Sequence, residues 1–598
     1  MNSEFSVAGS YRYDRSGPVR WILSHIWRNK KWAVGAVSAL VLANALNSVV
    51  QWLIGLAFDN LLETPPDRDA LLTITLVLIG LVIVRSSMDL AGWLLAEVTG
   101  QRLERDTREE LYLSLLGKSQ TFHNRQRVGD LMARANNDVR QMNMMVVPGA
   151  SLIIDSFSGL VIPIIFIALL KWQLLLAPLL FTACFLAALR RYMRKLDPVA
   201  ARQRMEFGHM NSVLTESVTG IEVVKSTVQE AQEQKKFLSA ARSFRDAAVR
   251  QGRIEAGYLP TLFVGFAIAG AAIHGLILIE RGQLSVGQLV TYLGLMQLLR
   301  FPTFISIFSF SLISLGRVSA GRILDLIKTE TRLDENQGGH SGRIDGEIRF
   351  ENVSFTYGGE PVLDNVSFVA APGETIAVVG ETGSGKSTLT KLVNRIYDAT
   401  SGRVLIDGVD VRDWRLDSLR SQISTIEQDI VLFSRPIAEN IAFSLGQDAS
   451  IEAVHRAARD AQADGFIREM PEGYETVIGE RGVTLSGGQR QRIAIARALL
   501  TDPRILMLDD STSAIDSATE DQIQRAIKAI TDDRTTILIT HRLSQIRWAD
   551  KVLVMRHGHV IDFGTHYELL QRCDLYQRIF ARYDKADVPA AVAVEEAG

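Results

Sequence analysis

Six apolar stretches in the first half of the chain constrain its fold more than any other feature. They lie at 32–58, 71–95, 145–170, 172–189, 257–279 and 289–315. Each is close to the ~20 residues that a helix needs to cross a bilayer. Because a bilayer core offers no water, every backbone donor must be satisfied within its own segment, which here requires a helix. We therefore expect six membrane-spanning helices, since six such runs in series argue against the alternative, buried core helices of a soluble protein.

The links between these stretches differ in length and charge. The first, third and fifth links are short and together contain three basic residues, Arg68, Lys171 and Arg281. The second and fourth, 96–144 and 190–256, are long and rich in basic residues, and their abundant Leu, Ala, Glu, Arg and Gln favour helices that extend beyond the membrane. By the positive-inside rule, we expect both long links and both termini in the cytoplasm.

The composition of the remaining segments excludes several classes of protein. A net charge of −2 gives no indication of a nucleic-acid partner. The two cysteines, Cys184 and Cys573, make neither a disulfide framework nor a metal-ligand pattern. The first seventeen residues have no apolar core and are not a cleavable signal. Gly17–Lys31 mixes tryptophans with basic residues, which predicts a short helix in the cytoplasmic headgroup layer, or else a solvated helix start.

A polar linker at 329–346 separates the apolar half from a region with α/β character. Alternating strands are predicted at 348–355 and 362–368, and buried strands are predicted to end at Val379, Leu508 and Thr540. Polar or turn residues follow each buried strand. Because α/β sheets bind ligands at the carboxyl ends of their strands, we expect a ligand site there.

The clearest chemical motif is GETGSGKS at Gly380–Ser387, which follows a buried strand and precedes a helical pattern. Its glycines allow backbone N–H groups to face phosphate oxygens, and the helix N-terminus adds a favourable dipole. Lys386 would contact the β- and γ-phosphates, and Ser387 would bind Mg²⁺. Asp509, after a second buried strand, is a candidate Mg²⁺ carboxylate. ATP and Mg²⁺ are therefore the predicted cofactors.

Between these two motifs lies the sequence LSGGQ at Leu485–Gln489. The order of motifs resembles the ATP-binding domain of ABC transporters, and LSGGQ resembles that family's signature sequence. Six spans with two long cytoplasmic links resemble the exporter-type half-transporters. By the same resemblance, 476–482 is similar to the exporter-specific loop and 513–516 to the D-loop.

The resemblance implies a set of site residues. Those implied for ATP are Tyr357, Gly380, Glu381, Thr382, Gly383, Ser384, Gly385, Lys386, Ser387, Thr388, Ser486, Gly487, Gly488 and Gln489; those for Mg²⁺ are Ser387, Gln428 and Asp509; those for hydrolysis are Asp510, His541 and Gln428. In the family, the signature sequence contacts the γ-phosphate held by the opposite subunit. The resemblance thus implies that the chain acts with a second copy or a sister half-transporter.

Asp510 departs from the family pattern, in which a glutamate at this position orients the attacking water. Aspartate is one methylene shorter, which leaves its carboxylate about 1.5 Å short, and a displacement near ~1 Å can cost ~10²-fold in rate. We hypothesise that this site binds ATP and hydrolyses it slowly, as in the degenerate subunit of heterodimeric exporters. The retained His541 leaves open a homodimer with two slow sites. A regulatory or gating subunit without transport is a further alternative.

The membrane half offers weaker signals. By resemblance, Val128–Arg134 with Asp138 and Glu216–Lys225 are predicted as the two coupling-helix regions. Polar candidates for a substrate cavity are Asn44, Asn47, Gln51, His274, Gln297 and Arg300, each of which could instead bond between helices. Arg300 is preferred because an ionisable residue within a span suggests function. Arg85 and Asp89 are expected to pair as i and i+4 neighbours, and Pro302 to kink the sixth span.

Together these observations predict an α-helical membrane domain joined to an α/β P-loop ATP-binding domain with an antiparallel β subdomain and a helical signature subdomain. The predicted boundaries are 1–31 (N-terminus and interfacial helix), 32–328 (membrane domain), 329–346 (linker), 347–583 (ATP-binding domain) and 584–598 (disordered tail). The predicted function is ATP-driven export of an amphipathic or hydrophobic substrate, such as a drug, lipid or peptide, across a bacterial inner membrane.

Overall fold

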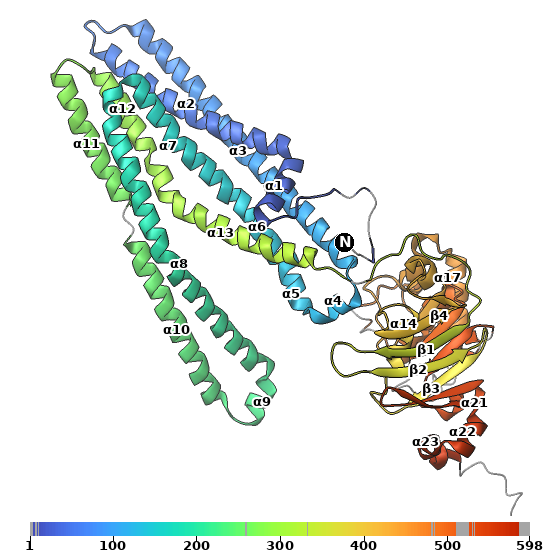
Figure 1. Ribbon diagram of the computed structural model, residues 1–598. Helices are drawn as coiled ribbons and strands as arrows, with labels where there is room; N and C mark the ends of the chain where they lie inside the picture. Colours follow the sequence, from blue (N-terminus) through green and yellow to red (C-terminus); the bar gives the residue numbers. More distant parts are fainter. Residues whose placement is uncertain are drawn as a thin grey trace, which may run out of the picture. The chain divides into compact units, whose positions relative to one another are not determined.

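The computed structural model describes residues 4–5, 9, 11–257, 260–331, 333–479, 482, 485–509, 526–528, 530–531 and 533–584. They form two compact units (Figure 1). A helical unit comprises 9–112 and 128–329, and an α/β unit combines 330–598 with 113–127 and the first eight positions, as far as these are described. The segment 113–127, from the first long link, thus packs with the α/β unit, which the sequence did not indicate.

Six helical segments within the described residues are long and apolar enough to cross a membrane. They correspond to the six predicted stretches and comprise α2 (Lys30–Leu62), α3 (Arg68–Leu116), α7 (Ser151–Leu170), α8 (Leu176–Thr219), α11 (Pro260–Glu280) and α12 (Val286–Leu298) continued by α13 (Arg300–Lys328). Large apolar side chains such as Leu72, Leu76 and Ile83 on α3 are exposed. A continuous apolar exterior of this kind is suited to contact with lipid.

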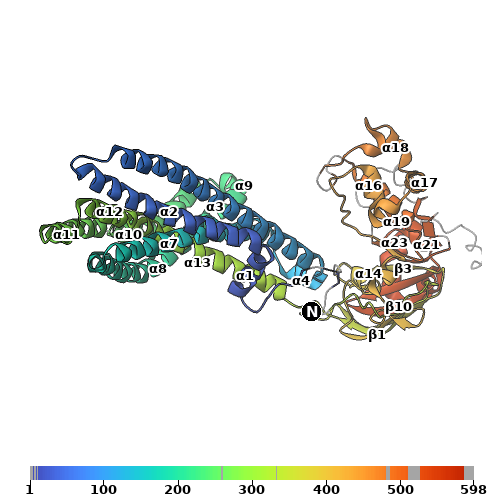
Figure 2. The same cartoon turned by 90° about the horizontal axis from the view of Figure 1, so that it is seen from above.

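Both long links are helical, as predicted. α3 continues to Leu116, and α8 continues to Thr219 before the short helix α9 (Ile221–Ser226) reverses the chain into α10 (Glu230–Ala256). In both views α8 and α10 run side by side as a long hairpin (Figures 1 and 2). An ion pair between Lys236 and Glu216, 2.9 Å apart, joins the two helices near α9. The hairpin is therefore a helical extension of two spans.

Two interruptions in the helical unit coincide with prolines. α12 ends at Leu298 and α13 begins at Arg300, two residues before Pro302, which has no N–H to donate to the Leu298 carbonyl. The predicted interruption of the sixth span is thus confirmed. The third span contains the short helices α5 (Val128–Ala133) and α6 (Val139–Met144), and is interrupted again at Val147 (φ −129°, ψ 113°), the residue before Pro148.

The N-terminal helix α1 (Pro18–Arg28) buries one side against α3. Trp21 Nε1 donates to Glu110 Oε2 at 2.9 Å, and His25 Nε2 lies 3.0 Å from the same oxygen. Leu23 and Trp27 on the opposite side are exposed. The amphipathic helix is therefore present, and its position in the headgroup layer stays a prediction.

The α/β unit contains two sheets. A four-stranded antiparallel sheet has the order β2-β1-β4-β5, with β1 (Ile348–Phe355), β2 (Leu363–Ala370), β4 (Ser401–Ile406) and β5 (Val409–Asp410). The second has the order β10-β9-β3-β8-β7-β6, with β3 (Thr375–Gly380), β6 (Ile423–Ile426), β7 (Ile505–Asp509), β8 (Thr535–Ile539), β9 (Lys551–Arg556) and β10 (His559–Gly564). Only β10 pairs antiparallel in this sheet.

Helices cover both sheets and complete the predicted subdomains. They are α14 (Lys386–Val393), α15 (Leu416–Arg420), α16 (Ile437–Ile441), α17 (Ile451–Asp460), α18 (Asp464–Arg468), α19 (Gly487–Leu500), α21 (Leu543–Trp548), α22 (His566–Arg572) and α23 (Asp574–Asp584). One apolar core joins both sheets to α14 through residues such as Phe350, Val378 and Leu389. A second core holds α16–α19 against β6 and β7. The predicted tail lies outside the described residues, apart from Asp584 at the end of α23.

Candidate functional site

The phosphate loop leaves the carboxyl end of β3 and enters α14. Gly383 (φ 82°) and Gly385 (φ 94°) have left-handed backbone conformations, which glycine adopts without steric cost. A Cβ on Gly385 would lie 2.6 Å from Leu363 Cδ2 and 2.7 Å from the Val362 carbonyl oxygen. Lys386 Nζ donates to the carbonyls of Gly380 and Glu381, at 2.9 and 2.8 Å, which holds its side chain across the loop. The motif therefore has the curved backbone that an anion-binding loop requires.

Neighbouring strands bring further predicted residues to this loop. A cavity of about 450 Å³ is lined by Val362, Val379, Gly380, Thr382, Gly383, Gly385, Lys386, Ser387, Thr388, Gln428, Asp509, Ile539, Thr540, His541, Ile579 and Phe580. Asp509 ends β7, while Gln428 and His541 follow β6 and β8 by two residues. Since parallel strands end at one edge of a sheet, residues far apart in sequence meet there. The sequence did not indicate Ile579 and Phe580 of α23, because the C-terminal helix carries no motif.

Oxygen ligands for a metal converge in this cavity. The Ser387 hydroxyl, the Gln428 amide and the Asp509 carboxylate all belong to its lining. Mg²⁺ prefers oxygen ligands and usually keeps several waters and substrate phosphates, so a small protein donor set fits it. The chemistry of these three donors is thus compatible with the metal that the motifs predict.

Tyr357 lies beside the cavity without lining it. Its hydroxyl is 3.3 Å from Thr388 Oγ1 on α14, and its ring is about half exposed. The ring packs edge-on against Tyr397, with centroids 5.2 Å apart and planes at 89°. An exposed aromatic face next to a phosphate loop is suited to stacking with a nucleotide base.

The signature residues lie outside the cavity. Ser486 caps α19: its hydroxyl accepts from the Gln489 N–H at 3.2 Å, and the Gln489 side chain accepts from the Ser486 N–H at 2.9 Å. Ser486 and Gly487 are exposed, whereas Gly488 is buried. The signature sequence thus forms an exposed helix N-terminus of this chain. Asp510 and the D-loop residues 513–516 lie outside the described residues, as do Glu480 and Arg481 of the predicted exporter loop.

A short helix from the first long link contacts the α/β unit. This helix, α4 (Gln120–Arg125), belongs to that unit, and Asn124 Nδ2 donates to the Tyr397 hydroxyl at 2.8 Å. Burial raises the pKa of the Tyr397 hydroxyl. The coupling region predicted at Val128–Arg134 belongs to the helical unit instead. Its role as a coupling region stays a prediction, and α4 is a further segment of the same link that packs within the α/β unit.

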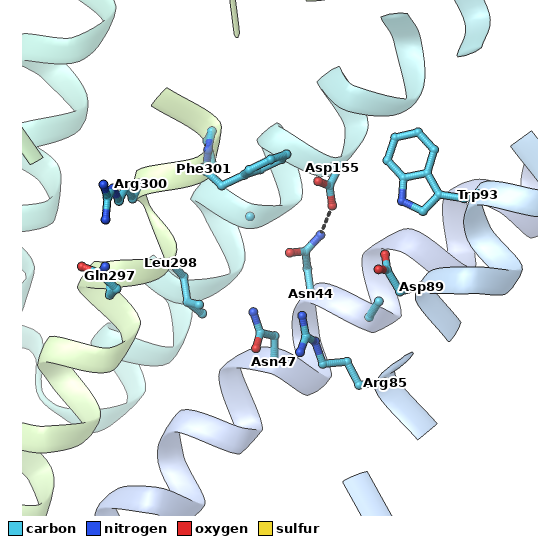
Figure 3. Close-up of a pocket in the computed structure, with 13 residues that line it drawn as sticks. Asn44, Asn47, Arg85, Asp89, Trp93, Asp155, Gln297, Leu298, Arg300 and Phe301 are labelled. Atoms are coloured by element: carbon cyan, nitrogen blue, oxygen red, sulfur yellow. Dashed lines mark hydrogen bonds between the residues drawn. The ribbon is translucent and has the colours of Figure 1, made fainter. Parts of the chain in front are cut away.

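A second candidate site lies within the helical unit. A cavity of about 800 Å³ is lined by Ala43, Asn44, Asn47, Arg85, Asp89, Trp93, Asp155, Gly159, Gln297, Leu298, Arg300, Phe301 and Pro302. Asn44 Nδ2 donates to Asp155 Oδ1 at 2.7 Å and lies 3.0 Å from Ser158 Oγ (Figure 3). We call it the polar cavity. Its lining comes from α2, α3, α7, α12 and α13.

Four of the six predicted cavity residues line the polar cavity. Asn44, Asn47, Gln297 and Arg300 line the polar cavity, whereas Gln51 and His274 do not. The Gln51 side chain lies against Gly294 on α12, which leaves space for it by having no Cβ. Asp155 was missed, although an acidic residue within an apolar run is the same kind of signal that favoured Arg300.

Arg85 and Asp89 do not form the predicted ion pair. Both side chains line the polar cavity, and no nitrogen of Arg85 lies within 4.0 Å of a carboxylate oxygen of Asp89. The prediction was wrong because i, i+4 spacing brings two side chains within reach without fixing where they point.

An α/β unit with a phosphate loop and a signature helix, attached to six apolar helices, defines a nucleotide-driven membrane transporter. Residues 34–303 match the family described as "ABC transporter transmembrane region", and residues 363–513 match the one described as "ABC transporter". The chain belongs to the ABC transporters and is an exporter-type half-transporter. It is therefore an integral multi-pass membrane protein and an ATP-hydrolysing transporter, and exporters of this family work as dimers.

Individual relatives support the same conclusion along nearly the whole chain. The chain is 33% identical to the uncharacterized ABC transporter ATP-binding protein YknU of Bacillus subtilis over 563 residues, 93% of this chain and 96% of that protein. It is 37% identical to an ATP-dependent lipid A-core flippase of Pseudomonas aeruginosa over 508 residues, 84% of this chain and 83% of that protein. A solved bacterial Atm1-family ABC exporter with ATP bound is similar with a TM-score of 0.79 and 29% identity, covering 94% of this chain and 99% of that chain.

Proposed function

We propose that this chain exports an amphipathic substrate as one half of a dimer and that its own nucleotide site hydrolyses ATP slowly. The observation that carries the proposal is the separation of two parts of one site. Lys386, Asp509 and His541 share a cavity, while Ser486 caps an exposed helix N-terminus elsewhere on the unit. A second subunit would supply the missing signature helix, so that ATP bridges two chains.

The roles within the cavity follow from its geometry. The backbone N–H groups of 380–387 and the Lys386 ammonium would bind the β- and γ-phosphates. Ser387, Gln428 and Asp509 would hold Mg²⁺, which neutralises phosphate charge when bound. His541, which lines the same cavity, would donate to the γ-phosphate, and the exposed ring of Tyr357 would stack on adenine. Closure of two such units on ATP would shift the helical units between two discrete states.

The proposal of slow hydrolysis depends on Asp510. In the sequence this residue directly follows β7 and precedes the D-loop. Its carboxylate is attached one methylene closer to the backbone than that of the glutamate expected by family resemblance. In a heterodimer, the intact signature of this chain would complete the faster site of a sister half-transporter; in a homodimer both sites would be slow. We propose that both termini face the cytoplasm of a bacterial cell. The name of the Pseudomonas aeruginosa relative, a lipid A-core flippase, favours a lipid-like cargo.

Replacing Asp510 by glutamate tests the slow site. We expect Asp510→Glu to raise ATP hydrolysis by the purified chain by at least tenfold, since a misplacement near ~1 Å can cost ~10²-fold. Hydrolysis would be measured in proteoliposomes at saturating Mg·ATP, with Lys386→Ala as the inactive reference. Brisk hydrolysis by the unmodified chain alone, unchanged in the glutamate variant, would contradict the slow site.

ATP-dependent uptake of a fluorescent amphiphile into inside-out vesicles tests export itself. The unmodified chain, alone or with its sister, should accumulate the amphiphile, and the Lys386→Ala variant should not. Nucleotide binding without uptake under either condition would favour the alternative, a gating subunit without transport.

A further inference from the structure

Four ionisable side chains line the polar cavity, and their formal charges cancel. Arg85 and Asp89 come from α3, Asp155 from α7 and Arg300 from α13. Among the described residues, none of the four takes part in an ion pair within 4.0 Å. Charges at membrane depth are costly unless they are compensated, so they usually pair with one another or serve a ligand. Here opposite charges are present in equal number and remain separate.

One local contact fixes the position of Asp155. The Asn44 amide donates to Asp155 at 2.7 Å, which fixes that carboxylate on the α2 side of α7. Arg85 and Asp89 lie one turn apart on α3, the usual spacing of an ion pair, yet they do not form one. In Figure 3, Asp89 and Asp155 lie on one side of Asn44, while Arg85 lies toward Asn47. The cavity is thus divided into an acidic and a basic part.

The acidic part also contains aromatic side chains. Trp93 lies beside Asp89, and the Phe301 ring extends from α13 toward Asp155 (Figure 3). Two carboxylates flanked by aromatic rings are suited to a substituted ammonium group, because ring faces and carboxylates both attract a cation. The basic part, with Arg85 and the Asn47 amide, offers N–H donors to a phosphate or carboxylate.

An apolar cavity of about 650 Å³ lies on the other side of α7. Its lining is Ile153, Ser156, Phe157, Leu160, Phe185, Leu186, Ala187, Leu189, Arg190, Met193, Pro302 and Phe310. It shares Pro302 with the polar cavity, and the two use alternate faces of α7, with Asp155 and Gly159 on one and Phe157 and Leu160 on the other. A polar and an apolar cavity that both have Pro302 in their lining suit the two ends of an amphiphile.

We propose that the helical unit selects a zwitterionic amphiphile. Asp89 and Asp155 bind the cationic group of its head, Arg85 binds the anionic group, and its chain occupies the apolar cavity. Arg300, with Gln297 at the opposite edge of the polar cavity (Figure 3), balances the charge of the second carboxylate. This inference rests on the proposed export function for its role in the cell, whereas binding of the head is a property of the helical unit alone.

Binding without ATP provides the test. The full-length chain in a nonionic detergent is titrated with three probes that share one brominated acyl or alkyl chain: a lysophosphocholine (zwitterionic), a lysophosphoglycerol (anionic) and a trimethylammonium (cationic). Quenching of tryptophan fluorescence reports binding, and with the bromines on the first carbons next to the head, loss of part of the quenching in Trp93→Phe assigns the head to the polar cavity. We expect the zwitterion to bind about tenfold more tightly than either singly charged probe, the factor that one additional charged contact supplies.

Variants that neutralise one charge test which group of the head each part of the polar cavity binds. Asp155→Asn should weaken binding of the zwitterion and of the cation about tenfold and leave binding of the anion unchanged. Arg85→Gln should weaken binding of the zwitterion and of the anion. Glu280→Gln and Arg281→Gln, at the exposed end of α11, remove the same charges outside the cavity and should change nothing. Retained binding of a fluorescent ATP analogue shows that the α/β unit of each variant is folded, and an unchanged circular dichroism spectrum shows that the helical unit is folded.

Two results would overturn the inference: equal binding of all three probes by the unmodified chain, or an equal loss for all three in Asp155→Asn and Arg85→Gln. Failure of the proposed function looks different. Head-group selectivity without ATP-dependent movement of the zwitterion in vesicles would contradict export and leave the selectivity intact. ATP-dependent movement that is indifferent to Asp155→Asn and Arg85→Gln would contradict the selectivity and leave export intact.

Discussion

Single residues of the phosphate loop show how far a motif determines geometry. The spacing of Gly380, Lys386 and Ser387 predicted the loop, and the structure gives the reason for one of its glycines. Gly385 combines a left-handed conformation with backbone and side-chain atoms closer than 3 Å to the position of a Cβ. In the polar cavity, by contrast, the sequence pattern did not predict the geometry. Arg85 and Asp89 share the lining of this cavity with Asn47 and Asp155 from distant helices, and i, i+4 spacing does not reveal such neighbours.

The cost of a side chain at Gly385 can be separated from the cost of its backbone conformation. Gly385→Ala should lower the free energy of unfolding by about 2–4 kcal/mol, because it adds a clash with Leu363 to the left-handed strain. Gly373→Ala is the matched control: its φ is 78° and no atom lies within 4 Å of a Cβ, so about 1 kcal/mol is expected. Thermal unfolding without nucleotide would measure both, and equal losses would show that the contact with Leu363 carries no cost.

At the scale of elements, sequence patterns predicted all six spans, the helical links and three of the strands that lead to the site, β3, β7 and β8, whereas β6, which precedes Gln428, was not predicted. The spans, the links and these three strands could be predicted from the sequence because the length of an apolar run and the alternation of apolar residues are local properties. The position of α4 could not be predicted from the sequence, because its Asn124 contacts a tyrosine 273 positions further along the chain. Nothing within the segment 113–127 signals that partner.

The contact between α4 and the ATP-binding domain predicts a measurable coupling. In a double-mutant cycle of Asn124→Ala and Tyr397→Phe, the interaction free energy should be about 0.5–1.5 kcal/mol, the usual net value of one hydrogen bond. Thermal unfolding of the nucleotide-bound chain would supply the four values. Arg127→Ala, an exposed change two residues after α4, gives the control cycle with Tyr397→Phe, for which additivity is expected. Additivity in both cycles would mean that the α4 bond contributes nothing.

At the scale of the whole molecule, the two parts of the proposed nucleotide site lie on different parts of one chain. The phosphate loop and its cavity are at the carboxyl edge of the parallel sheet, and the Ser486 helix N-terminus is exposed outside that cavity. An exposed capping serine at a glycine-rich helix start contributes little to the stability of the fold, because a solvated cap is worth only about 1 kcal/mol. It is well suited to receive an anion presented by another subunit.

Mixed dimers of two inactive variants distinguish a site shared between chains from one within a chain. Lys386→Ala removes the phosphate contact and Ser486→Arg blocks the signature helix. If sites are shared, a dimer of one Lys386→Ala chain and one Ser486→Arg chain keeps one intact site, built from the phosphate loop of the second and the signature of the first. A dimer of an unmodified chain and a chain with both changes keeps none. If each site lies within one chain, the two results are exchanged. Dimers isolated through two different affinity tags, and assayed for tightly retained ATP rather than for slow hydrolysis, should therefore retain about one nucleotide in the first combination and none in the second.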